Sequence, residues 1–509
     1  AAQPQGKQAD ETLLALAAVY RQLNRLPEAT ATLTKLLAEF PNSKFLDRAT
    51  FQLGECASAA GDFEAAAAHY QRVLQNWPQS LLAGHAQYGL ASAHLASKNY
   101  QGAVQTLAAL IDAHPEHAVA AKARYARALA RQRLGDYDGA QQDAIAFLAT
   151  NPTARERLDA LYLQGLCAAG SRQFARAAEI FGSILAADPK FASADKVLYE
   201  MAWSLKSANR ADESLSAFRR LATEHPNSPL AAESLFHQGE HFYQARQFVE
   251  AITNYQAALA KVPEVELGEK AVHKLGWSYF ELGQFERAQG AFESQLVAAP
   301  QGALAAAARF MVAESLFNLK QFQLAQSAYK TSLERLPENR DLQVLAHLHA
   351  AQTAAQLKTW TESLNLLDKG LTDFPESPRR PELLVESGWA QQNLDHPDEA
   401  TKLFERAIAE SDREPAARAR FMIGEIFFGK KQYKEAVRHY FKVAYGYGYP
   451  QAVESIRVWQ AQAAYQAGRS FEALNMADQA KKSYREVVEK YPRSDQAPLA
   501  KDRLQALGA

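Results

Sequence analysis

The chain has 509 residues, of which 48% are hydrophobic, and its 56 Lys and Arg almost balance its 57 Asp and Glu. The net charge of −1 gives no broad electrostatic attraction to nucleic acid or to an anionic membrane, so we expect neither as a partner. No apolar run approaches the roughly 18 residues that a membrane-spanning helix needs. The sequence therefore predicts no transmembrane segment.

Nine prolines recur every 37 residues, and a tenth follows one residue late. Only 20 of the 509 residues are proline, so nine in one register cannot arise by chance. A fixed period of this length indicates a chain built from one small unit that stacks on itself. The prolines in register are Pro41, Pro78, Pro115, Pro152, Pro189, Pro226, Pro263, Pro300 and Pro337, and Pro375 follows.

One unit can be followed from Pro41 to Pro78. Asn42-Ser43 can cap a first helix, and Gly61-Asp62 ends it. A second helix begins near Phe63 and stops at Trp77-Pro78, because proline cannot continue a helix. Each unit is thus predicted to be two antiparallel helices joined by a tight turn.

Two columns of the second helix run in phase through the whole chain. The first is always Ala or Ser, and we expect it to let the two helices approach closely. The second lies four residues later and is bulky in every unit except at Ala144. The small column is Ala29, Ala66, Ala103, Ala140, Ala177, Ser214, Ala251, Ala288, Ala325, Ser363, Ala400, Ala436 and Ala480.

This pattern resembles the tetratricopeptide repeat (TPR) family, as in Leu53-Gly54, Ala66, Tyr70, Val73 and Pro78. The resemblance implies an all-α fold, a TPR-type α-solenoid wound as a right-handed superhelix of about 13 repeats with a C-terminal capping helix. We expect a single solenoid over residues 1–509. It would contain nine regular repeats in 1–337, four less regular repeats in 338–492 and the capping helix in 493–509.

The period of 37 exceeds the usual TPR period of about 34. We place the three extra residues at the start of the first helix, after Pro-x-Ser links such as Pro41-Asn42-Ser43. This lengthened form resembles bacterial envelope TPR proteins, such as the Tol-Pal-associated periplasmic protein and the outer-membrane assembly lipoprotein. The string Phe51-Gln52-Leu53-Gly54-Glu55 shares in that resemblance. It implies a periplasmic or envelope location in a bacterium, with the cytoplasm as the alternative.

After Pro337 the register loosens. The loop that ends the twelfth repeat contains Tyr445, Tyr447 and Tyr449 separated by glycines. These tyrosines are either a contact site for a partner or side chains packed on neighbouring helices. A last helix, Asp495–Leu507, is expected to turn Leu499, Leu504 and Leu507 inward as a solenoid cap.

In TPR proteins the first helix of each repeat lines a concave groove. Here three columns of that helix are rich in aromatic residues, and they predict a groove that grips a segment of another protein. The glutamates would favour basic partners. The alternative is that the first column packs between helices. The candidate residues are Tyr162, Tyr199, Trp203, Phe236, Glu240, Tyr243, Trp277, Phe280, Phe310, Glu314, Phe317 and Trp389.

Two short strings imitate catalytic motifs. His237-Gln238-Gly239-Glu240-His241 has zinc-protease spacing, but Gly239 and Glu240 are repeat positions and no third ligand follows. The stretch 424–431 resembles a phosphate-binding loop yet falls inside a predicted helix. Cys56 and Cys167 lie three repeats apart, beyond disulfide reach. We therefore expect no catalytic residue, metal or cofactor.

The sequence favours a non-enzymatic scaffold that binds a protein or peptide along its concave face. A membrane-associated protein complex is one partner class that stays open, as does the oligomeric state. The alternative is a regulatory or structural TPR region of a larger protein or assembly whose catalytic or anchoring part lies elsewhere.

Overall fold

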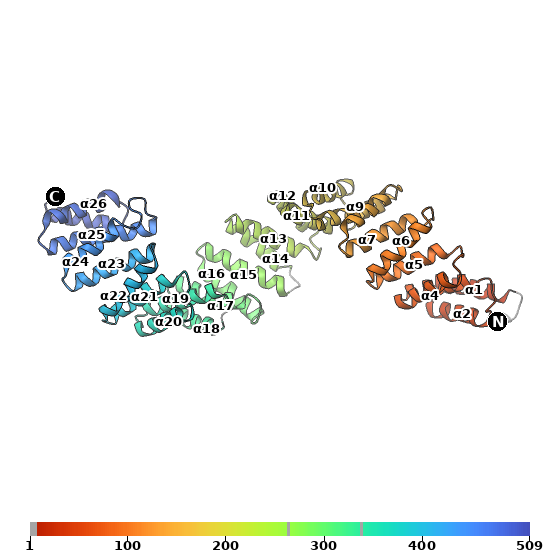
Figure 1. Cartoon of the computed structure of the whole chain (residues 1–509), viewed down its shortest axis with the longest axis horizontal. Helices are drawn as coiled ribbons and strands as arrows, with labels where there is room; N and C mark the ends of the chain where they lie inside the picture. The colour runs from red at the N-terminus through yellow and green to blue at the C-terminus, as the bar shows by residue number, and fades with distance from the viewer. Residues whose placement is uncertain (1–7, 262–264, 336–338, 509) are drawn as a thin grey trace. The chain divides into compact units, whose positions relative to one another are not determined.

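The computed structural model describes residues 8–261, 265–335 and 339–508 (Figure 1). Pro263 and Pro337 of the predicted register lie outside these ranges. Over the described residues the chain forms 27 α-helices and no strand. The helices make thirteen successive pairs followed by one last helix. The all-α solenoid expected from the sequence is therefore confirmed.

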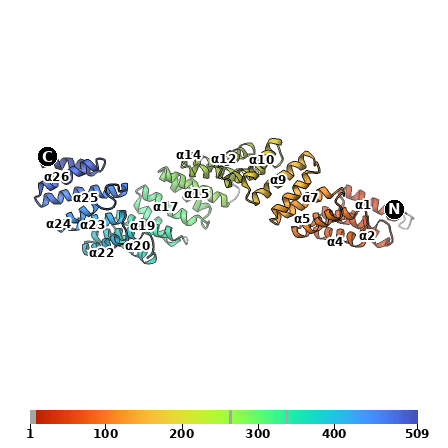
Figure 2. The same ribbon diagram turned by 45° about the horizontal axis from the view of Figure 1, so that its top comes forward.

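The chain divides into two compact units, Ala1–His241 and Phe242–Ala509. Within each unit, successive helices lie side by side in both views (Figures 1 and 2). The first unit contains α1 (Ala9–Gln22), α2 (Leu26–Glu39), α3 (Leu46–Ala59), α4 (Phe63–Asn76), α5 (Ala83–Ala96), α6 (Tyr100–Ala113), α7 (Ala120–Arg133), α8 (Tyr137–Leu148), α9 (Ala154–Gly170), α10 (Phe174–Ala187), α11 (Ala194–Ser207) and α12 (Ala211–Glu224).

The boundary between the units falls inside α13 (Ala231–Gln244). The second unit contains α14 (Phe248–Leu259), α15 (Val265–Glu281), α16 (Phe285–Ala298), α17 (Ala305–Asn318), α18 (Phe322–Glu334), α19 (Arg340–Gln356), α20 (Trp360–Asp373), α21 (Arg380–Asn393), α22 (Pro397–Glu410), α23 (Glu414–Gly429), α24 (Tyr433–Ala444), α25 (Glu454–Ala473), α26 (Ala477–Lys490) and α27 (Gln496–Ala506).

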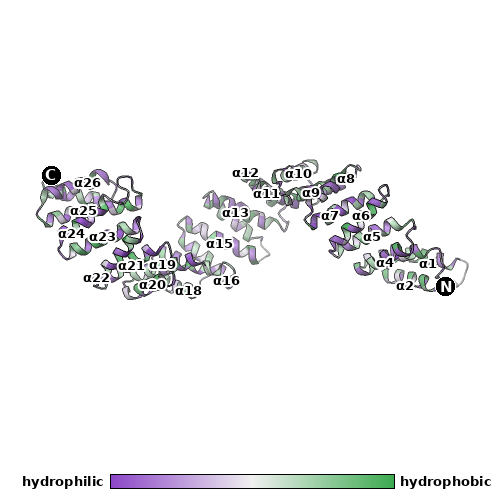
Figure 3. Cartoon of the chain, viewed as in Figure 1, coloured by the Kyte–Doolittle hydropathy of each residue, from purple (hydrophilic) through white to green (hydrophobic). Residues whose placement is uncertain are grey.

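Most helices carry apolar residues on one side and polar residues on the other, and Figure 3 shows green and purple alternating along the ribbons. All thirteen members of the small column are buried, with at most 3% of the residue exposed. Ser214 and Ser363, the two members that are not alanine, donate their hydroxyls to carbonyls of the preceding helix, at Ala202 and Ala351. The column thus sits where the two helices of a repeat touch.

In several repeats the bulky residue packs on a glycine of the first helix, sixteen residues earlier. A Cβ added to Gly54 would lie 2.7 Å from the Tyr70 ring, and one added to Gly276 would lie 2.7 Å from the Phe292 ring. Glycine leaves room for the ring in these repeats, whereas Phe218 and Tyr329 face Ala202 and Ala313 at the same position. The same contact recurs at Gly165–Phe181, Gly388–Phe404, Gly424–Tyr440 and Gly468–Tyr484.

The tight turn within each repeat also has one backbone requirement. In all thirteen repeats one turn residue adopts a positive φ, between 57° and 80°. At Gly61 the residue is glycine, which adopts this conformation freely. The other residues in this position are Asn24, Lys98, Gly135, Arg172, Asn209, Arg246, Gly283, Lys320, Lys358, Asp395, Lys431 and Asn475.

At the Pro-x-Ser links the three extra residues lie between repeats, so their predicted place in the first helix was wrong there. By contrast, α9, α15 and α19 have 17 residues and contain the extra residues in the first helix, as predicted. Both α3 and α4 have 14 residues, and residues 77–82 join α4 to α5. Ser43 does not cap α3 as predicted, because the residue at that cap is Phe45. Instead Ser43 accepts the N–H of Phe45 and donates its hydroxyl to Asp10 of α1, at 2.6 Å.

The Ser–Asp hydrogen bond ties neighbouring repeats together and recurs at a spacing of 33 residues. Ser80 donates to Asp47 at 2.5 Å, and Ser228 donates to Asp195 at 2.7 Å. In each case the serine belongs to the Pro-x-Ser link and the aspartate to the preceding first helix. The lengthened link therefore acts as a polar clip between repeats.

One link in the second unit makes the clip with a different pair. Gly302 stands at the serine position and Glu269 at the aspartate position. The Glu269 carboxylate accepts the N–H of Leu304 at 2.8 Å, which is the contact that the serine hydroxyl makes elsewhere. A Cβ on Gly302 would overlap the Glu269 carboxylate. The longer acid thus replaces both partners of the ordinary clip.

This replacement predicts strong coupling between the two positions. Gly302→Ser should push the Glu269 carboxylate off Leu304, and Glu269→Asp alone should leave that N–H out of reach. Each single change is expected to lower the free energy of unfolding by about 1–2 kcal/mol. The double variant restores the Ser–Asp pair and should recover most of that loss in urea titrations. Additive losses would contradict the proposed exchange.

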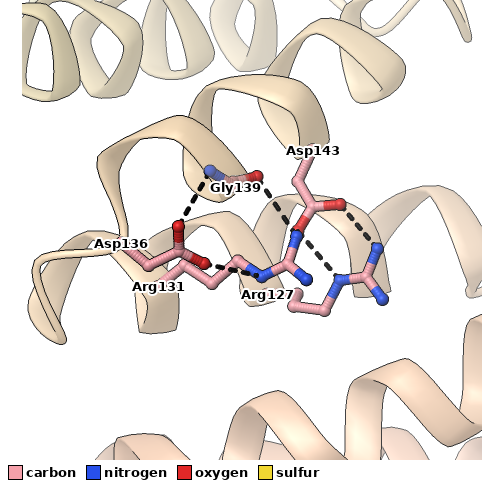
Figure 4. A network of polar contacts seen from close by, with 5 residues as sticks. All are labelled: Arg127, Arg131, Asp136, Gly139 and Asp143. Atoms are coloured by element: carbon pink, nitrogen blue, oxygen red, sulfur yellow. Dashed lines mark hydrogen bonds and ion pairs between the residues drawn. The ribbon is translucent and has the colours of Figure 1, made fainter.

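A buried ion cluster lies between α7 and α8 (Figure 4). Arg127 donates two hydrogen bonds to Asp143, at 2.6 and 2.8 Å, and Arg131 donates a third at 2.8 Å. Only 5% of the Asp143 side chain is exposed. Asp136 balances the second guanidinium at 3.4 Å. The cluster occupies the one repeat whose bulky position is an alanine, Ala144.

Phe147 takes over the role of the missing bulky residue in that repeat. Its ring centroid lies 5.1 Å from that of Tyr125 on α7. In other repeats the residue equivalent to Tyr125 contacts the bulky column, as Phe51 contacts Tyr70 at 5.5 Å. The aromatic contact has thus moved by about one turn of the second helix.

The last helix, α27, packs Leu504 and Leu507 against the cluster of buried residues beneath it. Leu499 was expected to join them, but 47% of this residue is exposed. Its position five residues before Leu504 places it on another side of the helix. The buried residues of α27 are instead Ala497 and Ala500.

Candidate functional site

All twelve predicted groove residues lie on first helices of the repeats. Those of the first unit are on α9, α11 and α13, and those of the second unit are on α13, α15, α17 and α21. They fall in three columns that recur at the repeat period. The three columns have different surroundings.

The first column packs against the second helix of its own repeat. Tyr162 lies 5.9 Å from Phe181 between ring centroids, and Phe310 lies 6.2 Å from Tyr329. Tyr199 lies 6.2 Å from Phe218 and donates its hydroxyl to Glu233 of α13, at 2.8 Å. Tyr162 and Tyr199 are half-buried. This column therefore serves mainly the contact between helices.

Two members of that column are core residues. Phe236 is 8% exposed and Phe310 is 5% exposed. Neither ring offers enough surface for a partner to bury. Phe236 and Phe310 are therefore packed between helices and are not groove contacts.

The second column contains three tryptophans that keep part of their surface exposed. Trp203 meets Phe218 edge to face at 6.2 Å, and Trp277 meets Phe292 in the same way at 6.5 Å. Trp389 meets Trp360 edge to face at 5.1 Å. Because each indole is fixed against a neighbouring ring, its remaining surface is held in place. Rigid aromatic surface of this kind loses little conformational entropy on binding.

Glu314 in the same column is already used inside the chain. Its carboxylate accepts the hydroxyl of buried Tyr329 at 2.5 Å and faces His349 Nδ1 at 2.6 Å. Only 13% of its side chain is exposed. Glu425 repeats the arrangement by accepting from the Tyr440 hydroxyl and from Gln466. The interpretation of Glu314 as an attractor of basic partners is replaced by this internal role.

Burial sets the protonation behaviour of these pairs. Burial raises the pKa of Glu425. It also raises the pKa of the Tyr329 and Tyr440 hydroxyls, and the negative charges of Glu314 and Glu425 raise these two pKa values further. The tyrosines therefore stay protonated and act as donors at neutral pH. Glu240, the other acidic candidate, is half-buried on α13.

The third column closes the turns of the second unit. Tyr243 contacts Phe248 at 5.5 Å, Phe280 contacts Phe285 at 5.1 Å and Phe317 contacts Phe322 at 5.6 Å between ring centroids. Each pair spans the tight turn of one repeat. All three first-helix members remain half-buried, so each retains some accessible ring surface.

His237 is enclosed by aromatic rings in the first unit. Its ring centroid lies 4.6 Å from that of Trp203 and 5.2 Å from that of Phe218. Its Nε2 lies 3.6 Å from Glu233, and its Nδ1 is buried with no hydrogen-bond partner among the described residues. Burial lowers the pKa of His237, and the charge of Lys206 lowers it further. The charge of Glu233 raises this pKa but does not outweigh the other two effects.

This environment predicts a pH dependence of stability. Because the folded pKa of His237 lies below its unfolded value of about 6.5, unfolding takes up a proton as the pH falls. The contribution of neutral His237 is complete above pH of about 6.5 and is lost as the pH falls towards the folded pKa. His237→Gln should make the urea midpoint depend less on pH between pH 5 and 7. Equal slopes of midpoint against pH in the variant and the unmodified chain would contradict this assignment.

The tyrosines of the loop at 445–449 pack on their surroundings. Tyr447 donates its hydroxyl to the Ala416 carbonyl at 3.1 Å and accepts from Arg420 at 2.9 Å. Tyr445 donates to Glu486 at 2.5 Å, and Tyr449 accepts from Lys490. Tyr445 still exposes 45% of its surface. The hydroxyls of the three tyrosines are therefore engaged within the chain, as expected if these side chains pack on neighbouring helices.

The two catalytic look-alikes have helical surroundings. Residues 424–429 belong to α23, and a Cβ on Gly424 would lie 2.6 Å from the Tyr440 ring. His237 and His241 each lie near one carboxylate, at 3.6 and 3.9 Å. No three His, Cys, Asp or Glu side chains of the described ranges could hold a metal ion together. Cys56 and Cys167 are buried free thiols.

Sequence reasoning missed three polar sets that organise the repeats. They are the Ser–Asp clip, the Tyr–Glu pair and the Arg127–Asp143–Arg131 cluster. The first two left a signal, namely Ser and Asp 33 residues apart at three links and Glu and Tyr 15 residues apart in two repeats. The ion cluster had a weaker signal, namely Arg127 and Asp143 at two positions where the other repeats carry no Asp, Glu, Lys or Arg.

Comparisons with known protein families agree with the repeat architecture. Two tetratricopeptide repeat models match residues 14–80, 273–340 and 385–453, and residues 462–494. A model named YfiO, described as an outer membrane lipoprotein, matches residues 83–233. No curated protein matches the chain. In the described ranges, no helix is both long and apolar enough for a membrane span.

Two solved structures are similar to the chain at low sequence identity. The Cut9-Hcn1 hetero-tetramer of the APC/C is 17% identical, with 99% of this chain and 97% of that chain covered and a TM-score of 0.37. A tetratricopeptide repeat protein from Parabacteroides merdae is also 17% identical, with 53% and 98% covered and a TM-score of 0.37.

Proposed function

Because this chain belongs to the tetratricopeptide repeat family, we propose that it is a non-enzymatic scaffold that binds a partner protein along its first helices. Repeats of this family generally mediate contacts between proteins. The partner surface consists of half-buried aromatic residues, described separately for each unit. It is Tyr162, Tyr199 and Trp203 in the first unit, and Tyr243, Trp277, Phe280, Phe317 and Trp389 in the second.

The tryptophans Trp203, Trp277 and Trp389 carry this proposal. The bulky positions of the second helices are buried throughout, whereas these three indoles keep part of their surface on the first helices. Tryptophan is enriched among residues that dominate binding energy at protein interfaces. Lys206 lies over the Trp203 ring at 4.8 Å and adds a charged rim beside one of these indoles.

We place the protein in the bacterial envelope, on the periplasmic side. The match of residues 83–233 to an outer membrane lipoprotein model supports this location, as does the 37-residue period. Fractionation of native cells with antibodies against the chain tests it directly. Recovery with cytoplasmic markers would contradict the location without affecting the scaffold proposal.

Site-specific photocrosslinking in native cells tests the binding face. A photoreactive phenylalanine analogue at position 203 or 277 should capture the same partner protein. At Val249 on α14 or Leu324 on α18, which are 62% and 58% exposed on second helices, it should not. Capture from both classes of position, or from the second helices alone, would contradict the assignment of the face.

A further inference from the structure

Glu200 on α11 is a carboxylate without a partner inside the first unit. It is half-buried, and it accepts no hydrogen bond and forms no ion pair with any residue of the described ranges. Lys196, one turn earlier on the same helix, is exposed and does not pair with it. Burial raises the pKa of Glu200, and no neighbouring donor or cation lowers it again. A carboxylate that loses water without gaining a donor is costly to the fold.

The repeat register shows which contact Glu200 lacks. It directly follows Tyr199 of the first column. In other repeats the residue at this position forms a polar contact with the second-column residue of the preceding first helix. For Glu200 that counterpart is Leu166 on α9, whose side chain has no donor. The polar contacts at the equivalent positions join Glu314 to His349, Gln352 to Glu386 and Glu425 to Gln466, at 2.6, 3.0 and 2.9 Å.

The surroundings of Glu200 are aromatic. Tyr199 precedes it, and Trp203 lies one turn later on α11, with its ring centroid 6.3 Å from that of Tyr199. Tyr162 approaches from α9. Burial raises the pKa of Tyr162 to about 12, and the charges of Glu200 and Asp195 contribute to this shift. The Tyr162 hydroxyl makes no hydrogen bond within the part of the chain that the structure describes. An unpaired carboxylate and an unpaired hydroxyl therefore lie among half-buried rings.

We propose that Glu200 binds a cationic side chain of the partner protein, an arginine or a lysine, among the rings of Tyr162, Tyr199 and Trp203. The inference rests on the proposed function and deepens it, because these three rings are the partner surface of the first unit. A cation supplies the charge that the chain itself does not place beside this carboxylate. The faces of aromatic rings attract the same cation.

Arginine fits this site better than lysine. A guanidinium can donate two parallel hydrogen bonds to the Glu200 carboxylate, stack on a ring and donate another hydrogen bond to the Tyr162 hydroxyl. It also loses less hydration than an ammonium group does. A metal ion is a poor occupant, because no three His, Cys, Asp or Glu side chains in the described ranges could hold one together.

Peptide titration of the full chain tests the charge preference. The probes are acetyl-Ala-Arg-Ala-amide, its lysine analogue and its glutamine analogue. The readout is the fluorine NMR signal of Trp203 in a chain labelled with 5-fluorotryptophan, assigned with the variant Trp203→Phe. We expect the arginine peptide to shift this signal at the lowest concentration and the glutamine peptide to bind at least about tenfold more weakly. Tightest binding of the lysine peptide would support the site with lysine as its ligand.

Matched variants locate the contact. Glu200→Gln should weaken binding of the arginine peptide at least about tenfold. Glu179→Gln, at an exposed acid on the second helix α10, should leave it unchanged.

Glu200→Leu separates binding from folding. It copies Leu163, which stands at the same position of α9 and is 2% exposed. Because it removes a desolvated and unpaired carboxylate, the variant should raise the urea midpoint while it abolishes binding of the arginine peptide. A residue that serves only the fold would lower the midpoint on substitution.

Several results would overturn the proposal. These are no shift of the Trp203 signal with either cationic peptide, equal binding of the arginine and glutamine peptides, equal binding to the unmodified and Glu200→Gln chains, or a lower urea midpoint of Glu200→Leu. A photocrosslink from position 203 to another residue of the same chain would make this chain, and not a partner, the source of the cation.

Photocrosslinking also distinguishes this inference from the proposed function. If position 203 captures the same partner equally well with and without Glu200→Gln, the scaffold proposal stands and the role of Glu200 is wrong. If position 203 captures no protein in either chain, the failure belongs to the proposed function, and the peptide titration still decides whether Glu200 binds a cation.

Discussion

Replacing Asp143 with alanine is expected to lower the free energy of unfolding by about 3–5 kcal/mol. The substitution would leave Arg127, with 14% of its side chain exposed, beside Arg131 without a counter-charge, while Arg131 would keep its contact with Asp136. A buried charge without its partner is costly, because neither water nor a counter-charge compensates it. The loss should appear in urea titration and in faster hydrogen exchange in α7 and α8.

The matched control replaces the whole ion cluster by the residues of other repeats. Leu53 stands at the position of Arg127, Leu205 at that of Arg131 and Ala217 at that of Asp143. The triple variant Arg127→Leu, Arg131→Leu and Asp143→Ala should therefore be far more stable than Asp143→Ala alone. If both variants lose the same stability, the unpaired charges are not the cause.

Phe292→Ala is expected to cost about 3–5 kcal/mol, because it removes a fully buried ring and leaves a cavity against α15. Urea titration of the full chain measures the loss. Gly276→Ala should cost about 1–3 kcal/mol by overpacking the same contact. The account requires that the ring and the glycine depend on each other.

The double variant Gly276→Ala with Phe292→Leu tests that dependence. Repeats whose bulky residue is leucine carry alanine at the glycine position, as in Ala17 with Leu33 and Ala91 with Leu107. The shorter side chain makes room for the added Cβ, so the double variant should lose less than the sum of its single changes. Strict additivity would contradict the packing argument.

The repeat architecture could be predicted from the sequence because its determinants are local and periodic. The 37-residue proline spacing fixed the unit, and Gly61-Asp62 marked the tight turn. The small column, predicted to lie where helices touch, is buried in all thirteen repeats. Because the same pattern occurs thirteen times, an irregular residue in one repeat does not hide it.

The predictions that failed depended on partners distant in the sequence. Ser43 looked like a helix cap, but its partner Asp10 lies 33 residues away in the preceding repeat. Glu314 looked like a surface charge, yet Tyr329 and His349 approach it from two other helices. A column of one helix shows which residues share a face, but the neighbouring helices determine whether that face is accessible.

The most direct test of the scaffold proposal is the affinity of the double variant Trp203→Ala and Trp277→Ala for the partner that crosslinking captures. The account predicts binding at least about tenfold weaker than that of the unmodified chain, with the helical circular dichroism retained and the melting temperature lowered by no more than a few degrees. Unchanged affinity, or loss of the folded state along with binding, would contradict it.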